Sequence, residues 1–308
     1  MAQVWRCSGL RWSQDGPVLV WDGGRRSALG RGKSVAFGVP DGTVRTCVGA
    51  RGHGCPRRTA VPGRSTGARC EECARLDRAH SVAADTIADD PRPYRVYLAW
   101  FGPGMVKVGI TAVERGSARL LEQGAVCFSW LGTGPLMAAR RTEELLRAAL
   151  GVPDRIPYAD KRAVRSELPR TAEGRAAELV ELHGRAVALT GWPESLAREP
   201  CLPVDHATVF GIAGTPGTSG DSGAEGLPVA FGEVAELVPG GAVGGELVAA
   251  AGPDLHLATA RGVVVLDTRL MTGWELCPAP ETATAPGGGH GFPVRELRRN
   301  AGFQDGLF

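Results

Sequence analysis

Four clustered cysteines constrain this chain more than any other feature. Cys47, Cys55, Cys70 and Cys73 fall within 27 residues, in the spacing C-x7-C-x14-C-x2-C. The C-x2-C pair can bend round one Zn²⁺ ion at about 2.3 Å from each sulfur, and the first two cysteines complete a tetrahedron. The intervening loop is rich in glycine, proline and arginine, so it needs a metal to organise it. We predict a structural zinc site, with His53 as a substitute ligand and four free buried thiols as the competing interpretation.

Length and hydropathy limit the class of protein. A chain of 308 residues suggests two domains, with room for an appendage. The longest apolar runs have the length of a strand, far short of the twenty or so residues that a membrane helix needs, and the first residues contain no signal-peptide core. These features predict a soluble, cytoplasmic protein with no membrane partner. In that compartment clustered cysteines indicate a metal site rather than disulfides.

The net charge of +2 hides a strong asymmetry. Residues 1–170 contain 27 Arg and Lys against 16 Asp and Glu, whereas residues 171–308 contain 8 against 17. Such a split predicts a nucleic-acid partner for the basic half. The alternative is two solvated surfaces of opposite sign that attract each other. Eight arginines lie between Arg45 and Arg78 against three acids, so the zinc knuckle itself can contact phosphates.

Residues 94–101 and 105–111 read as two short strands joined by Gly102-Pro103-Gly104, which favours a β-hairpin. Side chains alternate between the two faces of a strand. One face is therefore apolar, and the other contains Arg95, Tyr97, Lys107, Gly109 and Thr111. The second face is polar for the middle of a hairpin and leaves room for a ligand at its glycine.

Charged residues follow on the next two segments. Arg115 and Arg119 are spaced i,i+4, so a helix places both on one side. The helix expected from residue 135 to 150 carries Glu143 on its apolar stripe and Glu144 on its solvated side. A carboxylate on a packed face needs an arginine or a metal as partner. The alternative is a slightly misplaced surface glutamate.

These residues resemble a known superfamily. The order Val96-Tyr97-Leu98-Ala99, Lys107-Val108-Gly109-Ile110-Thr111, then arginines and a helical glutamate, is similar to the GIY-YIG nucleases, most closely to their phage-type DNA-binding branch. This resemblance covers about residues 94–150. Together with the four cysteines, the wider chain resembles an uncharacterised bacterial and archaeal family of unknown function. The resemblance implies a small antiparallel sheet flanked by helices, with the site on the polar hairpin face.

The resemblance also implies roles for single residues. Tyr97 corresponds to the tyrosine that helps activate water, Arg119 or Arg115 to the arginine that stabilises charge on the phosphate, and Glu143 to the ligand of one Mg²⁺ or Mn²⁺ ion. Two positions depart from the superfamily pattern, because Arg95 replaces a glycine and Lys107 replaces a tyrosine. No counterpart of the asparagine that closes many nuclease sites is present. Lys107 can neutralise a phosphate but cannot position water as a tyrosine does, so binding without cleavage is at least as well supported as cutting.

The flanks complete the predicted α+β fold. We expect a β-sheet region with the zinc knuckle at 1–90, the hairpin core at 91–170, a helical connector at 171–213, a flexible loop at 214–227 and an acidic β-rich region at 228–308. A small group of polar residues in the last region is interpreted as turn and edge residues of strands, namely Asp254, His256, Asp267 and Arg269.

The leading functional prediction is a zinc-containing protein that binds nucleic acid, with DNA favoured. The contacts are expected from Arg95, Lys107, Gly109, Thr111, Arg115 and Arg119. The second interpretation is a metal-dependent endonuclease that uses Tyr97, Lys107, the two helical arginines and Glu143. The third is a protein-interaction module that docks a partner on the hairpin face and the zinc knuckle.

Overall fold

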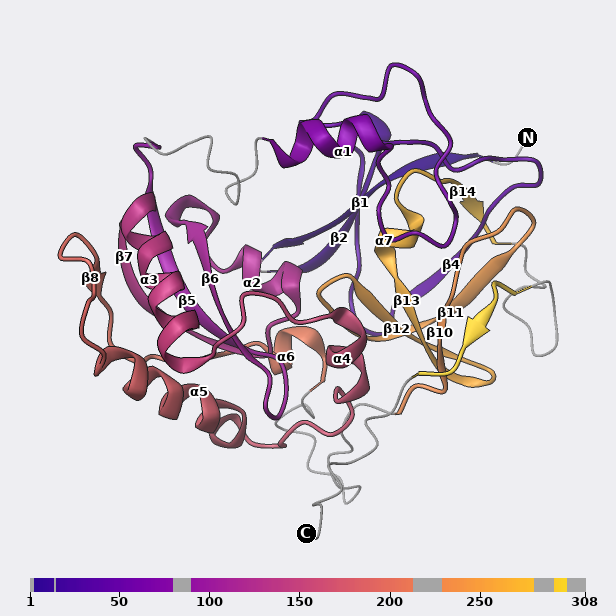
Figure 1. The fold of residues 1–308 in the computed structure, drawn as a ribbon. Helices are drawn as coiled ribbons and strands as arrows, with labels where there is room; N and C mark the ends of the chain where they lie inside the picture. The colour runs from indigo at the N-terminus through magenta and orange to yellow at the C-terminus, as the bar shows by residue number, and fades with distance from the viewer. Residues whose placement is uncertain (1–2, 14, 80–89, 213–228, 280–290, 298–308) are drawn as a thin grey trace, which may run out of the picture. The chain divides into compact units, whose positions relative to one another are not determined.

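A computed structural model describes residues 3–13, 15–79, 90–212, 229–279 and 291–297. The chain divides into two compact units, and each is described by itself (Figure 1). Unit 1 combines Met1–Ile87 with Val229–Glu296, and unit 2 combines Ala88–Pro228 with Leu297–Phe308. Both units mix helices with mainly antiparallel strands, which confirms the predicted α+β class. In the part of the chain that is described, no helix has the length and apolar character needed to cross a membrane.

Unit 2 is built on a five-stranded sheet in the order β6-β5-β7-β8, with β9 also paired to β7. The predicted hairpin is its centre, because β5 pairs with β6 over its whole length and with β7 on the other side. The elements of this unit are β5 (Pro93–Trp100), β6 (Val106–Ala112), η2 (Val113–Arg115), α2 (Ala118–Gln123), β7 (Cys127–Pro135), α3 (Leu136–Leu150), α4 (Tyr158–Ala163), α5 (Ala172–Val187), β8 (Ala197–Arg198), β9 (Val204–Asp205) and α6 (Ala207–Phe210).

Two hydrophobic clusters cover the two faces of this sheet. Val96, Leu98 and Val108 pack with the buried stripes of α3 and α5 in one cluster. Tyr97 and Leu120 belong to the other, which α2 covers. The expected sorting of the hairpin side chains is therefore confirmed, and so is the helix that ends at residue 150. It stops there because Gly151 follows with a left-handed φ of 65°.

Unit 1 contains a ten-stranded sheet in the order β15-β10-β13-β12-β11-β4-β14-β1-β2-β3. All neighbouring pairs are antiparallel except β10 with β13. Its elements are β1 (Trp5–Ser13), β2 (Gly16–Trp21), η1 (Asp22–Gly24), β3 (Arg26–Ala28), β4 (Ser34–Gly38), α1 (Glu71–Arg78), β10 (Gly232–Val234), β11 (Ala242–Ala251), β12 (Asp254–Thr259), β13 (Gly262–Asp267), α7 (Thr268–Met271), β14 (Glu275–Pro278) and β15 (Val294–Arg295).

The two ends of the chain share this sheet. Strand β4 lies between β11 and β14, and β14 in turn pairs with β1. The regions expected at 1–90 and 228–308 thus form one unit. The charge asymmetry does not follow the units either, because unit 1 has 17 basic and 15 acidic residues and unit 2 has 18 of each. The basic half is therefore not a separate domain, and a positively charged binding surface would have to be formed by a shorter segment of the chain.

The interpretation of Asp254, His256 and Asp267 as turn and edge residues holds only in part, because Asp254 begins β12 and Asp267 ends β13 and caps α7, but none of the three lies on an edge strand. Their exposures are 0%, 3% and 4%. Strands β12 and β13, which carry them, lie inside the sheet with partner strands on both sides, and the three side chains are buried. Asp267 also accepts three hydrogen bonds from the side chain of Arg269, at 2.6–3.2 Å. The loop expected at 214–227 and most of the connector before residue 93 lie outside the described residues.

Candidate functional site

The four clustered cysteines come together in unit 1. The sulfur atoms of Cys47, Cys55, Cys70 and Cys73 all lie within 4.8 Å of one another. A tetrahedral ion bound to four sulfurs at about 2.3 Å holds them about 3.8 Å apart, so this spacing fits a metal centre. Within the described ranges they are the only group of three or more metal-ligating side chains. His53, the substitute ligand, is exposed and does not belong to this group.

The backbone around the cysteines is shaped to hold them. Gly49 has a φ of +84°, and a Cβ atom there would overlap the carbonyl of His53, so the turn after Cys47 requires glycine. The amides of Gly49 and Cys70 donate to Cys47 Sγ at 3.3 Å and 3.2 Å. Such donors stabilise a thiolate, which is the form of cysteine that binds metal.

The last two cysteines are placed by α1. Cys70 is the N-cap of this helix and Cys73 lies in its first turn, where the helix dipole favours negative charge. The amide of Cys73 lowers the pKa of Cys70, and the amide of Thr59 lowers the pKa of Cys55 to about 6. Burial instead raises the pKa of Cys73 to about 12. A metal ion would replace the proton that this buried thiol keeps.

The loop contains few apolar side chains. Its hydrophobic cluster consists of the cysteines with Val61 and Ala50. The residue types, spacing and backbone donors form a site that can hold a metal ion such as zinc.

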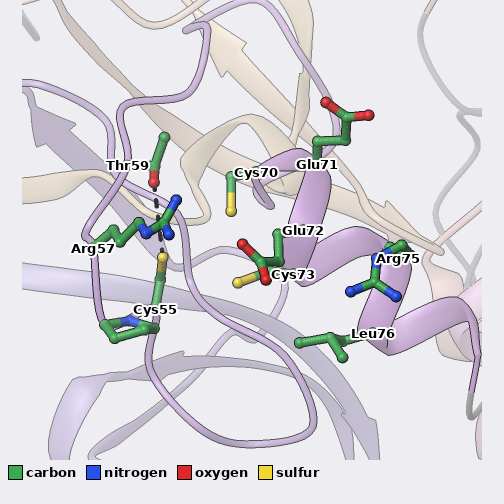
Figure 2. A pocket seen from close by; sticks show the side chains of 10 residues that line it. Cys55, Arg57, Thr59, Cys70, Glu71, Glu72, Cys73, Arg75 and Leu76 are labelled. Carbon is green, nitrogen blue, oxygen red and sulfur yellow. Dashed lines mark hydrogen bonds between the residues drawn. The ribbon is translucent and has the colours of Figure 1, made fainter.

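A pocket of about 680 Å³ opens beside the cysteine cluster (Figure 2). Cys55, Cys70 and Cys73 line it, whereas Cys47 is not among its lining residues. Arg57 borders it from the loop, and Arg75 borders it from α1. The metal centre is therefore covered on the Cys47 side and approachable from the pocket.

Arg45 is a functional residue that the sequence did not reveal. Arg45 is one of the eight arginines for which the sequence suggests phosphate contacts. In the structure, however, it is only 1% exposed. Its guanidinium donates to four backbone carbonyls, those of Pro62, Ser65, Arg269 and Thr272, at 2.5–2.9 Å. Burial lowers its pKa to about 10, which leaves it charged at neutral pH. This residue fastens the cysteine loop to the C-terminal part of the sheet.

In unit 2 the polar hairpin residues lie opposite one another across the strands. Arg95 faces Thr111, Tyr97 faces Gly109, and Lys107 faces an alanine. The Tyr97 ring lies over Gly109, where a Cβ atom would collide with its hydroxyl group. Thr111 is 4% exposed, and among the described residues its hydroxyl has no hydrogen-bond partner.

Tyr97 and Lys107 are buried, at 1% and 9% exposure. The side-chain amide of Gln123, a residue that sequence reasoning did not single out, donates to the Tyr97 hydroxyl at 3.1 Å. Burial raises the pKa of Tyr97. Burial lowers the pKa of Lys107 to about 8, and Lys107 Nζ donates to the carbonyl of Asp154 at 3.3 Å. These two groups are held inside the fold rather than presented to solvent.

Glu143 and Arg119 act on this same pair. The charges of both residues contribute to the pKa values of Tyr97 and Lys107. Glu143 is half-buried, and burial followed by the charge of Asp154 raises its pKa. Glu144, in contrast, is exposed and pairs with Arg147 at 3.5 Å, as expected for a solvated neighbour.

The two arginines after the hairpin do not share one helix. Arg115 ends η2, whereas Arg119 lies in α2. Gly116 separates the two elements with a φ of +49°, so the expected i,i+4 arrangement is wrong. Arg115 forms an ion pair with Glu122 at 2.7 Å, while Arg119 is exposed and forms no ion pair with a described residue. Arg95 lies over the ring of Trp130, with 4.9 Å from its guanidinium carbon to the ring centroid.

One protein-family model matches the chain, over residues 43–276. Its description is "Protein of unknown function (DUF2797)". The match includes all four cysteines of the metal centre and the whole hairpin site. No curated protein and no solved structure matches the chain.

Proposed function

The chain belongs to this family of unknown function, and we propose that it is a zinc protein that binds nucleic acid through the loop its four cysteines close. Zinc is supported by the ligand set, because four thiolates at tetrahedral spacing favour Zn²⁺ over harder ions. A site with four protein ligands keeps no position for water, so the ion organises the loop rather than attacks a substrate.

The observation that carries nucleic-acid binding is the charge of the loop. Seven of the eight arginines in the loop and the adjoining helix α1, counted from Arg45 to Arg78, are exposed, namely Arg51, Arg57, Arg58, Arg64, Arg69, Arg75 and Arg78. Only three acidic residues lie in the same stretch. A zinc ion with four thiolates adds a net charge of about −2, which leaves the loop clearly positive. Exposed arginines on a rigid loop are suited to bind phosphates.

We expect the affinity for a fluorescent DNA oligonucleotide to fall steeply with salt, because bound arginines release counterions. Arg57 and Arg64 are exposed and form no ion pair within the described residues. Replacing both by glutamine should lower the slope of log K against log salt by about two. Fluorescence anisotropy over a salt series measures this.

The matched control is the double variant Arg26→Gln/Arg31→Gln, which removes two exposed arginines of the same unit outside the loop. It should keep most of the salt slope. Equal losses in both variants would mean that charge alone, not the loop, governs binding. Absence of any affinity at low salt would overturn the proposal and favour the protein-interaction module.

A second candidate function, a divalent-metal-dependent endonuclease, is favoured by one observation in unit 2. The charges of Arg119 and Glu143 contribute to the pKa values of Tyr97 and Lys107, and these four residues match those that the GIY-YIG resemblance singles out. The burial of the Tyr97 hydroxyl and its hydrogen bond from Gln123 weigh against water activation. We therefore rank cleavage below binding.

If the chain cleaves DNA with Mg²⁺ or Mn²⁺, the Glu143→Gln variant should nick DNA at least about a hundredfold more slowly. The variant would lose the carboxylate that holds the metal ion, and with it the neutralisation of charge at the phosphate. The control Glu144→Gln removes an exposed carboxylate one position away and should keep full activity. Any phosphate contact of Lys107 should weaken as pH rises through about 8, because the amine then loses its charge. Equal activity in both glutamate variants would exclude this mechanism.

A further inference from the structure

The pocket beside the cysteine cluster exposes one metal ligand more than the others. Cys70 is partly exposed, whereas Cys47, Cys55 and Cys73 are buried. Cys70 also lines the 680 Å³ pocket (Figure 2). A small molecule in the pocket can thus approach this sulfur without unfolding the loop.

Cys47 differs from Cys70 in its access to solvent and in the number of backbone donors to its sulfur that the structure shows. It is 1% exposed, and two backbone amides donate to its sulfur. Hydrogen bonds of this kind draw electron density from a thiolate and weaken it as a nucleophile. Two ligands of one centre therefore differ in access, because Cys70 is partly exposed and Cys47 is buried.

The remaining lining favours uncharged molecules. Apart from the metal centre, Arg57 and Arg75 balance the charges of Glu71 and Glu72 around the pocket. Leu76, which is 40% exposed, adds an apolar wall. Neither a strong anion nor a strong cation is selected by this set.

We propose that Cys70 is a modification site for small, uncharged, soft electrophiles, and that its alkylation opens the metal centre. This rests on the metal centre proposed above. The Cys70 thiolate attacks the electrophilic carbon, a sulfur–carbon bond forms, and the bond to the leaving group breaks with its electron pair. The product is a thioether, which is a weaker ligand for zinc than a thiolate, so the loop loses part of its anchor.

The test uses the full zinc-loaded chain and substoichiometric iodoacetamide, with iodide as the leaving group. Peptide mass spectrometry reads the alkylation of each cysteine, and a chromogenic chelator reads zinc release. We expect Cys70 to react at least about tenfold faster than Cys47. Cys201 and Cys277, which are also partly exposed but lie outside the cluster, serve as internal references.

Two arms make the result decisive. Leu76→Trp should slow Cys70 labelling severalfold by filling the pocket, whereas the control Val44→Trp, at a position 62% exposed, should not.

Excess free zinc should leave the rate of Cys70 labelling unchanged if the metal-bound thiolate reacts directly. Simultaneous labelling of all four cysteines, suppressed by added zinc, would overturn the inference. Failure of DNA binding would leave it standing, because neither readout requires nucleic acid, and a chain without zinc would be recognised by metal analysis beforehand.

Discussion

Cys47→Ser is expected to abolish metal binding and to lower the free energy of unfolding of unit 1 by more than about 4 kcal/mol, a loss typical of removing a metal site. Cys47 is 1% exposed and its sulfur accepts two backbone hydrogen bonds, so serine cannot replace it without leaving the loop open. Metal content by mass spectrometry and thermal unfolding measure the two effects. Chelation of the wild-type protein should reproduce the loss of stability.

The control for this change is Cys277→Ser. Cys277 is partly exposed, lies in β14 and only donates weakly to the carbonyl of Gly38 at 3.5 Å. This variant should retain the metal and nearly all of its stability. A Cys47→Ser protein that keeps one zinc ion per chain would contradict the assignment of the four ligands.

Arg45→Gln is expected to destabilise unit 1 by more than about 3 kcal/mol, because four backbone carbonyl groups lose a buried charged donor at once. Glutamine is too short to reach both the loop and the segment after β13. Denaturant unfolding of the two proteins measures the difference. Arg64→Gln, which removes an exposed arginine of the same loop, should change stability by less than about 0.5 kcal/mol.

An equal effect of the two substitutions would show that the four hydrogen bonds of Arg45 contribute nothing measurable. Loss of zinc in Arg45→Gln, measured on the folded fraction, would add that this arginine also supports the metal centre. The two variants therefore separate an arginine that belongs to the interior from one that is available to a partner.

Short-range patterns predicted much of this molecule. Alternation placed Tyr97 and Lys107 on one face of the hairpin, and the helical stripe set Glu143 apart from Glu144. The spacing of the cysteines identified a centre that can hold a metal. Each of these features depends on residues close in sequence, where the repeat of a strand, helix or ligand loop is visible.

Long-range contacts were not predictable in this way. Arg45 differs in no local respect from the arginines around it, yet its carbonyl partners lie up to 227 positions away. The role of Gln123 depends on how α2 packs over β5. The pairing of β4 with β11 joins segments that about two hundred residues separate, and no periodicity in either segment signals that pairing. The GIY-YIG relationship, which rests on short signatures, stays a prediction.

The shared sheet of unit 1 has a consequence for synthesis on the ribosome. Unit 2 is inserted between the two parts of unit 1, so all of Ala88–Pro228 emerges before β11 and β14 exist to pair with β4. While unit 2 is synthesised, strand edges in the amino-terminal part of the chain therefore stay unpaired, and such edges are prone to aggregation. The cysteine loop closes over only 27 residues and can take up its metal early. Early capture of zinc would order the first segment while the rest of its sheet is still being made.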